Sequence, residues 1–92
     1  MWQVYEHVDL DKSIRKLPRE ILVKYEKWKD IVRFSGPKGL KEIRGFRDEK
    51  LKGVWASFRS SRLNLQYRVI YQVEENRFNV KVIRVTPHDY RR

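Results

Sequence analysis

The sequence contains no cysteine, and only four of its 92 residues are glycine and three are proline. Without cysteine the chain has no disulfide, no thiolate metal ligand and no cysteine nucleophile. Hydrophobic runs are short, and none approaches the ~18 residues of a membrane-spanning helix. Residues 1–6 lack the basic and apolar regions of an export signal. These absences predict a protein of the reducing cytoplasm, with one domain over residues 1–92.

Negative charge is scarce beside positive charge. The chain has 22 Lys and Arg against 12 Asp and Glu, a formal net charge of +10. Residues 1–35 carry +2 and residues 36–92 carry +8, so the excess lies in the second half. A concentrated positive field attracts polyanions such as nucleic acid. On charge alone two other interpretations stay open: a device for solubility, and a surface that a negatively charged protein partner covers.

Two helices are predicted in the first half, after a short strand over residues 2–5. A short helix capped by Asp9 or Asp11 reaches Leu17, and a longer helix has Pro18 in its first turn and ends at residues 35–37. In the longer helix apolar residues recur every three or four positions, which is typical of a helix face buried in a core. This face comprises Ile21, Tyr25, Trp28, Ile31 and Val32.

Beyond residue 53 the period of the hydrophobic pattern changes from 3.6 to 2. This change predicts strands over residues 54–59, 66–73 and 78–85, joined by turns at 60–65 and 74–77. A basic connector over residues 38–52 holds one short helical turn. The order predicts an α+β fold with an N-terminal strand, two helices and an antiparallel three-strand meander packed on the helices. One face of the sheet is then left open for chemistry.

The pairing of the first two meander strands suggests an anion site. If Phe58 lies opposite Val69, so that apolar side chains share one face, Arg59 falls opposite Arg68. Like charges facing each other across strands repel, and a phosphate bound between the two guanidinium groups would relieve that repulsion. An acidic residue of the connector could neutralise the pair instead, and a shift of one residue in the register would separate it.

The sequence has two histidines, and we treat them differently. His7 follows the first strand and is interpreted as a surface residue. His88 follows the last strand and is close in sequence to Tyr90, Arg91 and Arg92. Histidine transfers protons near neutral pH, and RNA cleavage by a 2′-hydroxyl requires a proton at the leaving 5′-oxygen. His88, which lies close to basic residues in the sequence, is therefore a candidate general acid.

Three segments together resemble the RelE toxin superfamily. They are residues 58–61 (FRSS), residues 67–73 (YRVIYQV) and residues 88–92 (HDYRR). The order of elements and the length are similar to that superfamily over nearly the whole chain. The resemblance implies a RelE- or YoeB-like toxin of a type II toxin–antitoxin system, held by a cognate antitoxin. Such a toxin enters the ribosomal A site and cleaves mRNA by 2′-hydroxyl attack, without a metal or other cofactor.

The resemblance also implies roles for individual residues. Arg68 matches the arginine that binds the scissile phosphate, and Arg59 a second arginine on the phosphate side. His88 stands at the place of the general acid, and Tyr90 is near the tyrosine that stacks on or orients a base. Glu49, with Asp48 beside it, is the candidate general base. Further candidates for RNA and phosphate binding are Lys50, Lys52, Trp55, Arg62 and Arg91.

The chain departs from RelE itself on the second strand. Where RelE carries two lysines this sequence has Trp55 and Ser57, and Lys50 and Lys52 lie just upstream. Trp55 could stack on a nucleobase instead. With Glu49 and His88 as base and acid, the site is more similar to YoeB.

Two alternative functions stay open at this point. One is a ParE-like toxin, which has the same fold but inhibits DNA gyrase and cleaves nothing, so it needs no proton-transfer residues. The other is a nucleic-acid-binding module whose basic face only holds phosphates. Known phosphate-loop and zinc motifs are absent from the sequence.

Overall fold

The computed structural model describes residues 1–87, in which one mixed sheet has strand order β1-β5-β4-β3-β2. β1 runs parallel to β5, and the other neighbouring strands are antiparallel. The strands are β1 (Gln3–Glu6), β2 (Glu49–Lys50), β3 (Arg59–Arg62), β4 (Tyr67–Glu74) and β5 (Asn79–Pro87). The α-helices are α1 (Leu10–Arg15), α2 (Arg19–Ser35) and α3 (Pro37–Lys41), and the 3₁₀ turns are η1 (Arg44–Phe46), η2 (Gly53–Trp55) and η3 (Glu75–Arg77). The predicted α+β fold is confirmed.

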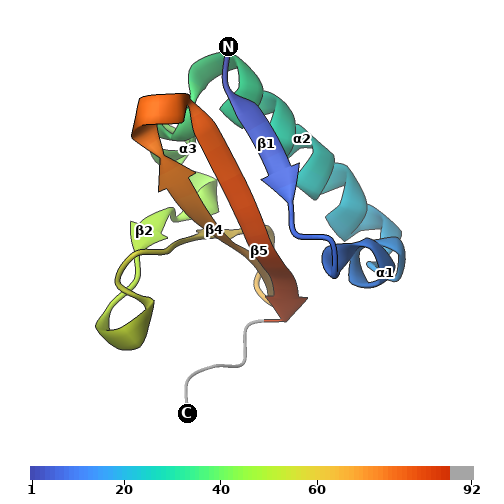
Figure 1. Ribbon diagram of the computed structural model, residues 1–92. Coiled ribbons are helices and arrows are strands. Elements are labelled where there is room, and N and C mark those ends of the chain that lie inside the picture. Colours follow the sequence, from blue (N-terminus) through green and yellow to red (C-terminus); the bar gives the residue numbers. More distant parts are fainter. Residues whose placement is uncertain (88–92) are drawn as a thin grey trace.

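The helices lie behind one face of the sheet (Figure 1). The predicted apolar face of α2 is buried as expected, with Trp28 fully enclosed. Its ring meets that of Tyr71 from β4 edge to face, with centroids 5.2 Å apart. Val80 and Val82 of β5 complete this side of the core. In the described part of the chain no helix has the length and apolar character needed to cross a membrane.

The first predicted meander strand, over residues 54–59, is wrong. Gly53 adopts a left-handed φ of +67° and starts the η2 turn, which leaves Val54 93% exposed. The strand β3 begins only at Arg59, and two of its residues, Ser60 and Ser61, are buried although they are polar. The alternation of apolar residues over 54–58 therefore belongs to a turn and does not mark a strand.

The predicted register between the first two meander strands is also wrong, for the same reason. Because β3 starts later, Arg59 pairs with Tyr71, and the residue opposite Arg68 is Arg62. Residues directly opposite each other share a face of the sheet. Arg59 and Arg68 therefore lie on opposite faces, whereas Arg62 and Arg68 lie together on the face turned away from the helices, called here the open face.

A β-bulge interrupts the pairing of β4 with β5. Ile70 lies opposite Arg84, whereas Tyr71 lies opposite Val82, so Ile83 is an extra residue. The bulge changes which residues of β5 face the core. Val82 and Val85 are both buried, although an uninterrupted strand would place them on opposite faces.

The end of β1 is tied to α2 by a charged contact. The Glu6 carboxylate accepts hydrogen bonds from the Tyr25 hydroxyl at 2.7 Å and the Lys29 ammonium at 3.1 Å. Burial opposes its ionisation, but these bonds and the Lys29 charge outweigh it, and the pKa of Glu6 falls below its ordinary value of 4.5. A lowered folded-state pKa contributes stability above the unfolded pKa, and that contribution is lost as pH falls through the folded value.

We therefore expect Glu6→Gln to flatten the acid limb of the stability curve. Between about pH 5 and about pH 3 the wild-type free energy of unfolding should fall more than that of the variant. Urea unfolding followed by circular dichroism at several pH values measures both slopes. Equal slopes in the two proteins would contradict this assignment of Glu6.

Candidate functional site

Two neighbouring acidic residues at the start of β2 each meet an arginine, on opposite faces of the sheet. Glu49 pairs with Ser60 across β2 and β3 and lies on the open face. There its Oε2 is 3.3 Å from Nη2 of Arg68. Nε of Arg68 also donates a hydrogen bond to Oγ of Ser60, at 2.6 Å. Glu49, Ser60 and Arg68 come from three adjacent strands and meet at one point. We call the contact between Glu49 and Arg68 the Glu49–Arg68 pair.

Asp48 makes the other pair, on the helix side. Oδ2 accepts two hydrogen bonds from Arg59, from Nε at 3.0 Å and from Nη2 at 2.9 Å. Oδ1 accepts from the Ser61 hydroxyl at 2.7 Å and the Tyr71 hydroxyl at 2.5 Å. Burial and the neighbouring Asp48 charge raise the pKa of Tyr71 well above its ordinary value, so this hydroxyl stays a donor. The four bonds fill both oxygens of Asp48.

The two pairs differ in what they can do. The Asp48 side chain is fully buried, whereas the Glu49 side chain is 58% exposed. Asp48 is therefore a structural residue and not the alternative general base that the sequence allows. Arg59 is occupied by Asp48 on the other face from Arg68, so its predicted role as a second phosphate-side arginine is wrong.

Arg68 is more enclosed than the sequence suggests. It lies on the sheet face that the sequence predicts to be open for chemistry, but its side chain is only 4% exposed. Burial strengthens the interaction of the guanidinium with nearby anions, because the local dielectric is low. A buried charge also requires an anionic partner. Its carboxylate partner, Glu49, is largely in water and is the exposed member of the pair. A phosphate arriving from solvent would therefore meet Glu49 first and could take over its place on the guanidinium.

A cleft of about 490 Å³ adjoins the pair on the open face. Its floor includes Ile70 and Thr86, and Thr86 lies directly opposite Arg68 across β4 and β5. Trp55, 41% exposed, lines the cleft, and its ring meets that of Phe58 edge to face, with ring centroids 5.4 Å apart. The rest of the lining is Leu51, Lys52, Arg84 and Pro87. We call this the Trp55 cleft.

The other predicted site residues divide into three groups. Lys52 and Trp55 line the cleft together, and Arg62 stands opposite Arg68 on the open face. Lys50 pairs with Arg59, which places it on the other face from Glu49, so its grouping with Lys52 is wrong. His88, Tyr90 and Arg91 lie outside the described residues.

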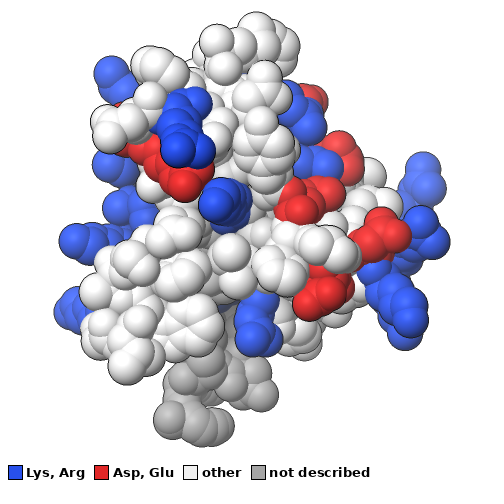
Figure 2. All heavy atoms as spheres, in the orientation of Figure 1, with Lys and Arg blue, Asp and Glu red and all other residues white. Residues whose placement is uncertain are grey.

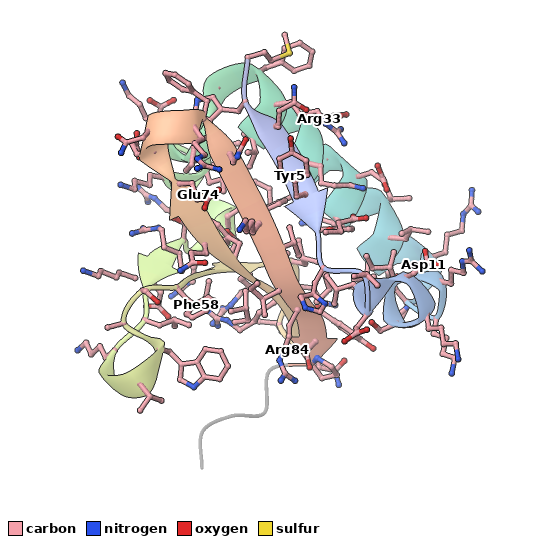
Figure 3. The ribbon with its side chains drawn as sticks, in the orientation of Figure 1. Tyr5, Asp11, Arg33, Phe58, Glu74 and Arg84 are labelled. Atoms are coloured by element: carbon pink, nitrogen blue, oxygen red, sulfur yellow. The ribbon has the colours of Figure 1, made fainter. Side chains whose placement is uncertain are left out.

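Sequence reasoning missed Arg84. It lines the cleft because the bulge at Ile83 turns it to the open face. The sequence holds one signal of this, since the apolar alternation of Val80 and Val82 resumes at Val85 after one extra residue. In Figure 3, Arg84 lies at the C-terminal end of β5, on the same side of the sheet as Tyr5 and Glu74.

The charges on the open-face side are unevenly distributed. In Figure 2 the acidic side chains gather over α1 and α2 and near the η3 turn, whereas the loop between β2 and β3 shows basic and uncharged residues. Within residues 1–87 no group of three or more His, Asp or Glu is placed to hold a metal ion. The arrangement can bind a phosphate through Arg68, hold an apolar ring against Trp55, and present one exposed carboxylate beside the phosphate.

The structure matches solved structures over nearly its whole length. A chain of the archaeal RelE–RelB complex from Pyrococcus horikoshii OT3 is 24% identical, covers 97% of both chains and superposes with a TM-score of 0.75. This protein has the RelE fold. A YoeB/ParE toxin from Agrobacterium tumefaciens is 17% identical, with 95% of this chain and 99% of that chain covered and a TM-score of 0.72. A chain of the YoeB–YefM complex from Staphylococcus aureus is 16% identical, with 97% and 99% covered and a TM-score of 0.72.

The likeness is one of fold. No protein-family model and no curated protein matches the sequence. At 24% identity or less the chemistry does not follow from the RelE fold, because one fold can carry different functions.

Proposed function

We propose that this protein is the toxin of a type II toxin–antitoxin system and cleaves mRNA in the ribosomal A site of the cytoplasm, without a metal. The observation that carries the proposal is the contact of an exposed carboxylate, Glu49, with a buried guanidinium, Arg68, on the open face. Cleavage by a 2′-hydroxyl needs a base and a phosphate-binding cation within a few ångströms, because the attacking oxygen and the phosphate belong to the same nucleotide.

The reaction runs through these two side chains and the tail. Glu49 accepts the proton of the 2′-hydroxyl, and the 2′-oxygen forms a bond to phosphorus. Arg68 stabilises the negative charge that develops on the phosphate oxygens. The bond from phosphorus to the 5′-oxygen breaks, and His88 supplies the proton that this oxygen takes. The products are a 2′,3′-cyclic phosphate and a 5′-hydroxyl.

The neighbouring groups hold the RNA. Trp55 offers an aromatic face to one base, and Lys52 and Arg62 attract the backbone phosphates on either side of the pair. Tyr90 and Arg91 are assigned, from the resemblance alone, to the base and the backbone. Lys50 and Arg59 have no part in this assignment, because both lie on the other side of the sheet.

Trp55→Ala should weaken the binding of single-stranded RNA by about tenfold or more, because stacking contributes roughly 1–3 kcal/mol per base. Fluorescence anisotropy of a labelled oligonucleotide measures the Kd. Val54→Ala is the matched control, since Val54 lies in the same turn and is 93% exposed but does not line the cleft. Equal affinities in all three proteins would remove Trp55 from the binding site.

A cognate antitoxin is the second expected partner. Two of the structures with this fold are complexes, RelE with RelB and YoeB with YefM. With its own net charge of +10, this chain suits an antitoxin segment that is acidic or amphipathic and packs on its groove or helices. Such a segment over the Glu49–Arg68 pair would keep RNA out.

The test mixes purified protein with translating ribosomes and, separately, with naked mRNA in the presence of a chelator, and maps the cut ends. The proposal predicts cleavage between codon bases on ribosomes only, with a 2′,3′-cyclic or 3′-phosphate and a 5′-hydroxyl. A 5′-phosphate product, or activity that the chelator abolishes, would contradict the mechanism.

A ParE-like inhibitor of DNA gyrase is the alternative, because a YoeB/ParE toxin has this fold as well. That function needs no carboxylate beside a phosphate-binding arginine. Gyrase supercoiling assays separate the two: inhibition at stoichiometric protein, with intact mRNA on ribosomes, would favour the alternative.

A further inference from the structure

A second cavity lies on the other side of Arg84 from the Trp55 cleft. It also has a volume of about 490 Å³ and lies between α1 and the end of β5. Its lining includes His7, Asp9, Leu10 and Ser13 on one side and residues 83–86 on the other. Arg84 and Thr86 line both cavities, so the two spaces meet at these side chains. We call the second space the α1 cavity.

The β-bulge is what places Arg84 between them. Had β5 alternated regularly through Ile83, with no bulge, Arg84 would share the face of Val82, which is the core. Bulges are common next to functional sites, where they redirect a side chain. The side chain of Arg84 is exposed, and no ion pair within residues 1–87 involves it. Arg84 is therefore a cation at the junction of two hollows, and no ion pair within residues 1–87 joins it to Asp9, the acidic residue that lines the α1 cavity.

The α1 cavity lies where β1 ends and no longer pairs with β5. β1 pairs with β5 only as far as Glu6 opposite Val82, and the chain then turns into α1. The His7 amide donates to the Val82 carbonyl at 3.1 Å, which fixes this departure. The His7 ring accepts a hydrogen bond at Nδ1 from the Asp9 amide, at 3.2 Å. In this arrangement the proton of the neutral ring is on Nε2, which is available as a donor.

We propose that single-stranded RNA continues from the Trp55 cleft across Arg84 into the α1 cavity. Arg84 binds the backbone phosphate between two nucleotides, and the His7 side chain contacts the nucleotide that lies in the α1 cavity. This inference rests on the proposed function and extends it by a second nucleotide subsite. The volume of each cavity falls within the range of roughly 300–1,000 Å³ that is typical of small-ligand sites.

An RNA strand fits these features better than a protein segment does. The two hollows are separated by one cation, which matches a chain in which each base is followed by one phosphate. The guanidinium is planar and binds two phosphate oxygens at once. One hollow also adjoins the Glu49–Arg68 pair, where the scissile phosphate would lie.

The test uses oligonucleotides with a 2′-deoxy residue at the cleavage position, which lack the attacking hydroxyl, so that no cleavage can disturb the binding measurement. They are shortened one nucleotide at a time from each end, and the Kd of each is measured for wild type, Arg84→Ala and Arg77→Ala. Arg77 is the matched control, because it is an exposed arginine in the η3 turn and loses the same charge. Circular dichroism establishes that each variant is folded.

We expect removal of one terminal nucleotide to weaken wild type and Arg77→Ala by about tenfold, and Arg84→Ala by about twofold at most. A loss in Arg84→Ala that is equal for every length, or no loss at all, would overturn the second subsite. Failure of wild type to bind any of the oligonucleotides would overturn it as well.

Cleavage of unmodified mRNA separates this inference from the proposed function. Arg84→Ala should raise KM by about tenfold and leave kcat within about twofold, because the residue binds RNA and does not touch the reacting atoms. If wild type binds with the expected length dependence but cuts nothing, the nuclease proposal fails and the subsite stands. If wild type cuts and the length dependence is the same without Arg84, only the subsite fails.

Discussion

Arg68→Ala should lower the rate of mRNA cleavage by about a thousandfold, because loss of one group that stabilises transition-state charge costs roughly 10²- to 10³-fold in kcat. The low exposure of Arg68, 4%, places it at the strong end of that range, since screening by water is weak. Single-turnover cleavage on ribosomes, with protein in excess, measures the chemical step directly.

Arg68→Lys distinguishes charge from geometry. Lysine keeps the charge but loses the planar fork that reaches Ser60 and Glu49 together, so we expect most of the rate to be lost here too. Arg77→Ala again serves as the control for net charge and should cleave at the wild-type rate. If Arg68→Ala is folded and cuts within about tenfold of wild type, Arg68 is not the group that stabilises the phosphate.

Substitution of the neighbouring residues Asp48 and Glu49 should affect different properties, stability for Asp48 and cleavage for Glu49. Asp48→Asn should lower the free energy of unfolding by about 3 kcal/mol or more, because breaking a buried ion pair leaves an uncompensated charge. The amide would also turn an N–H group toward one of the donors of Arg59, Ser61 and Tyr71. In a domain of this size such a loss corresponds to about 15 °C in Tm.

Glu49→Gln should change stability by about 1 kcal/mol at most, because the carboxylate is 58% exposed and the amide oxygen can still accept from Arg68. Its effect should fall on cleavage instead, since an amide cannot accept the proton of the 2′-hydroxyl. Thermal unfolding of both variants by circular dichroism tests the contrast. Similar losses of stability in Asp48→Asn and Glu49→Gln would show that both pairs are structural.

The helical half of the fold could be predicted from the sequence because its signals are local. The face of Ile21, Tyr25, Trp28 and Val32 follows the helix period and is buried against the sheet. The long strands β4 and β5 alternate over enough residues to be recognised as strands. These patterns depend only on neighbours in the chain.

The first meander strand could not be placed because its position is set by distant contacts. Ser60 and Ser61 carry no hydrophobic signal, and they are buried because their hydroxyls bond to Arg68 and Asp48. The apolar residues before them mark a turn. The error in register followed, and with it the wrong pairing of Arg59 with Arg68.

The candidate site was predicted in part. Glu49 and Arg68 were named separately, from the resemblance, and the structure brings them into contact. The sequence could not separate Glu49 from Asp48, because adjacent residues of a strand face opposite sides and only the sheet decides which side is buried. Arg84 was missed because a bulge of one residue moves it to the open face.

The central claim is that the contact of Glu49 with Arg68 is catalytic, and a double-mutant cycle tests it most directly. Single-turnover cleavage of ribosome-bound mRNA is measured for Glu49→Gln, Arg68→Lys and the double variant. Groups that act as a unit are not additive, so the double variant should cut about as slowly as the slower single variant. Wild-type cleavage by Glu49→Gln, or losses that simply multiply in the double variant, would contradict the account.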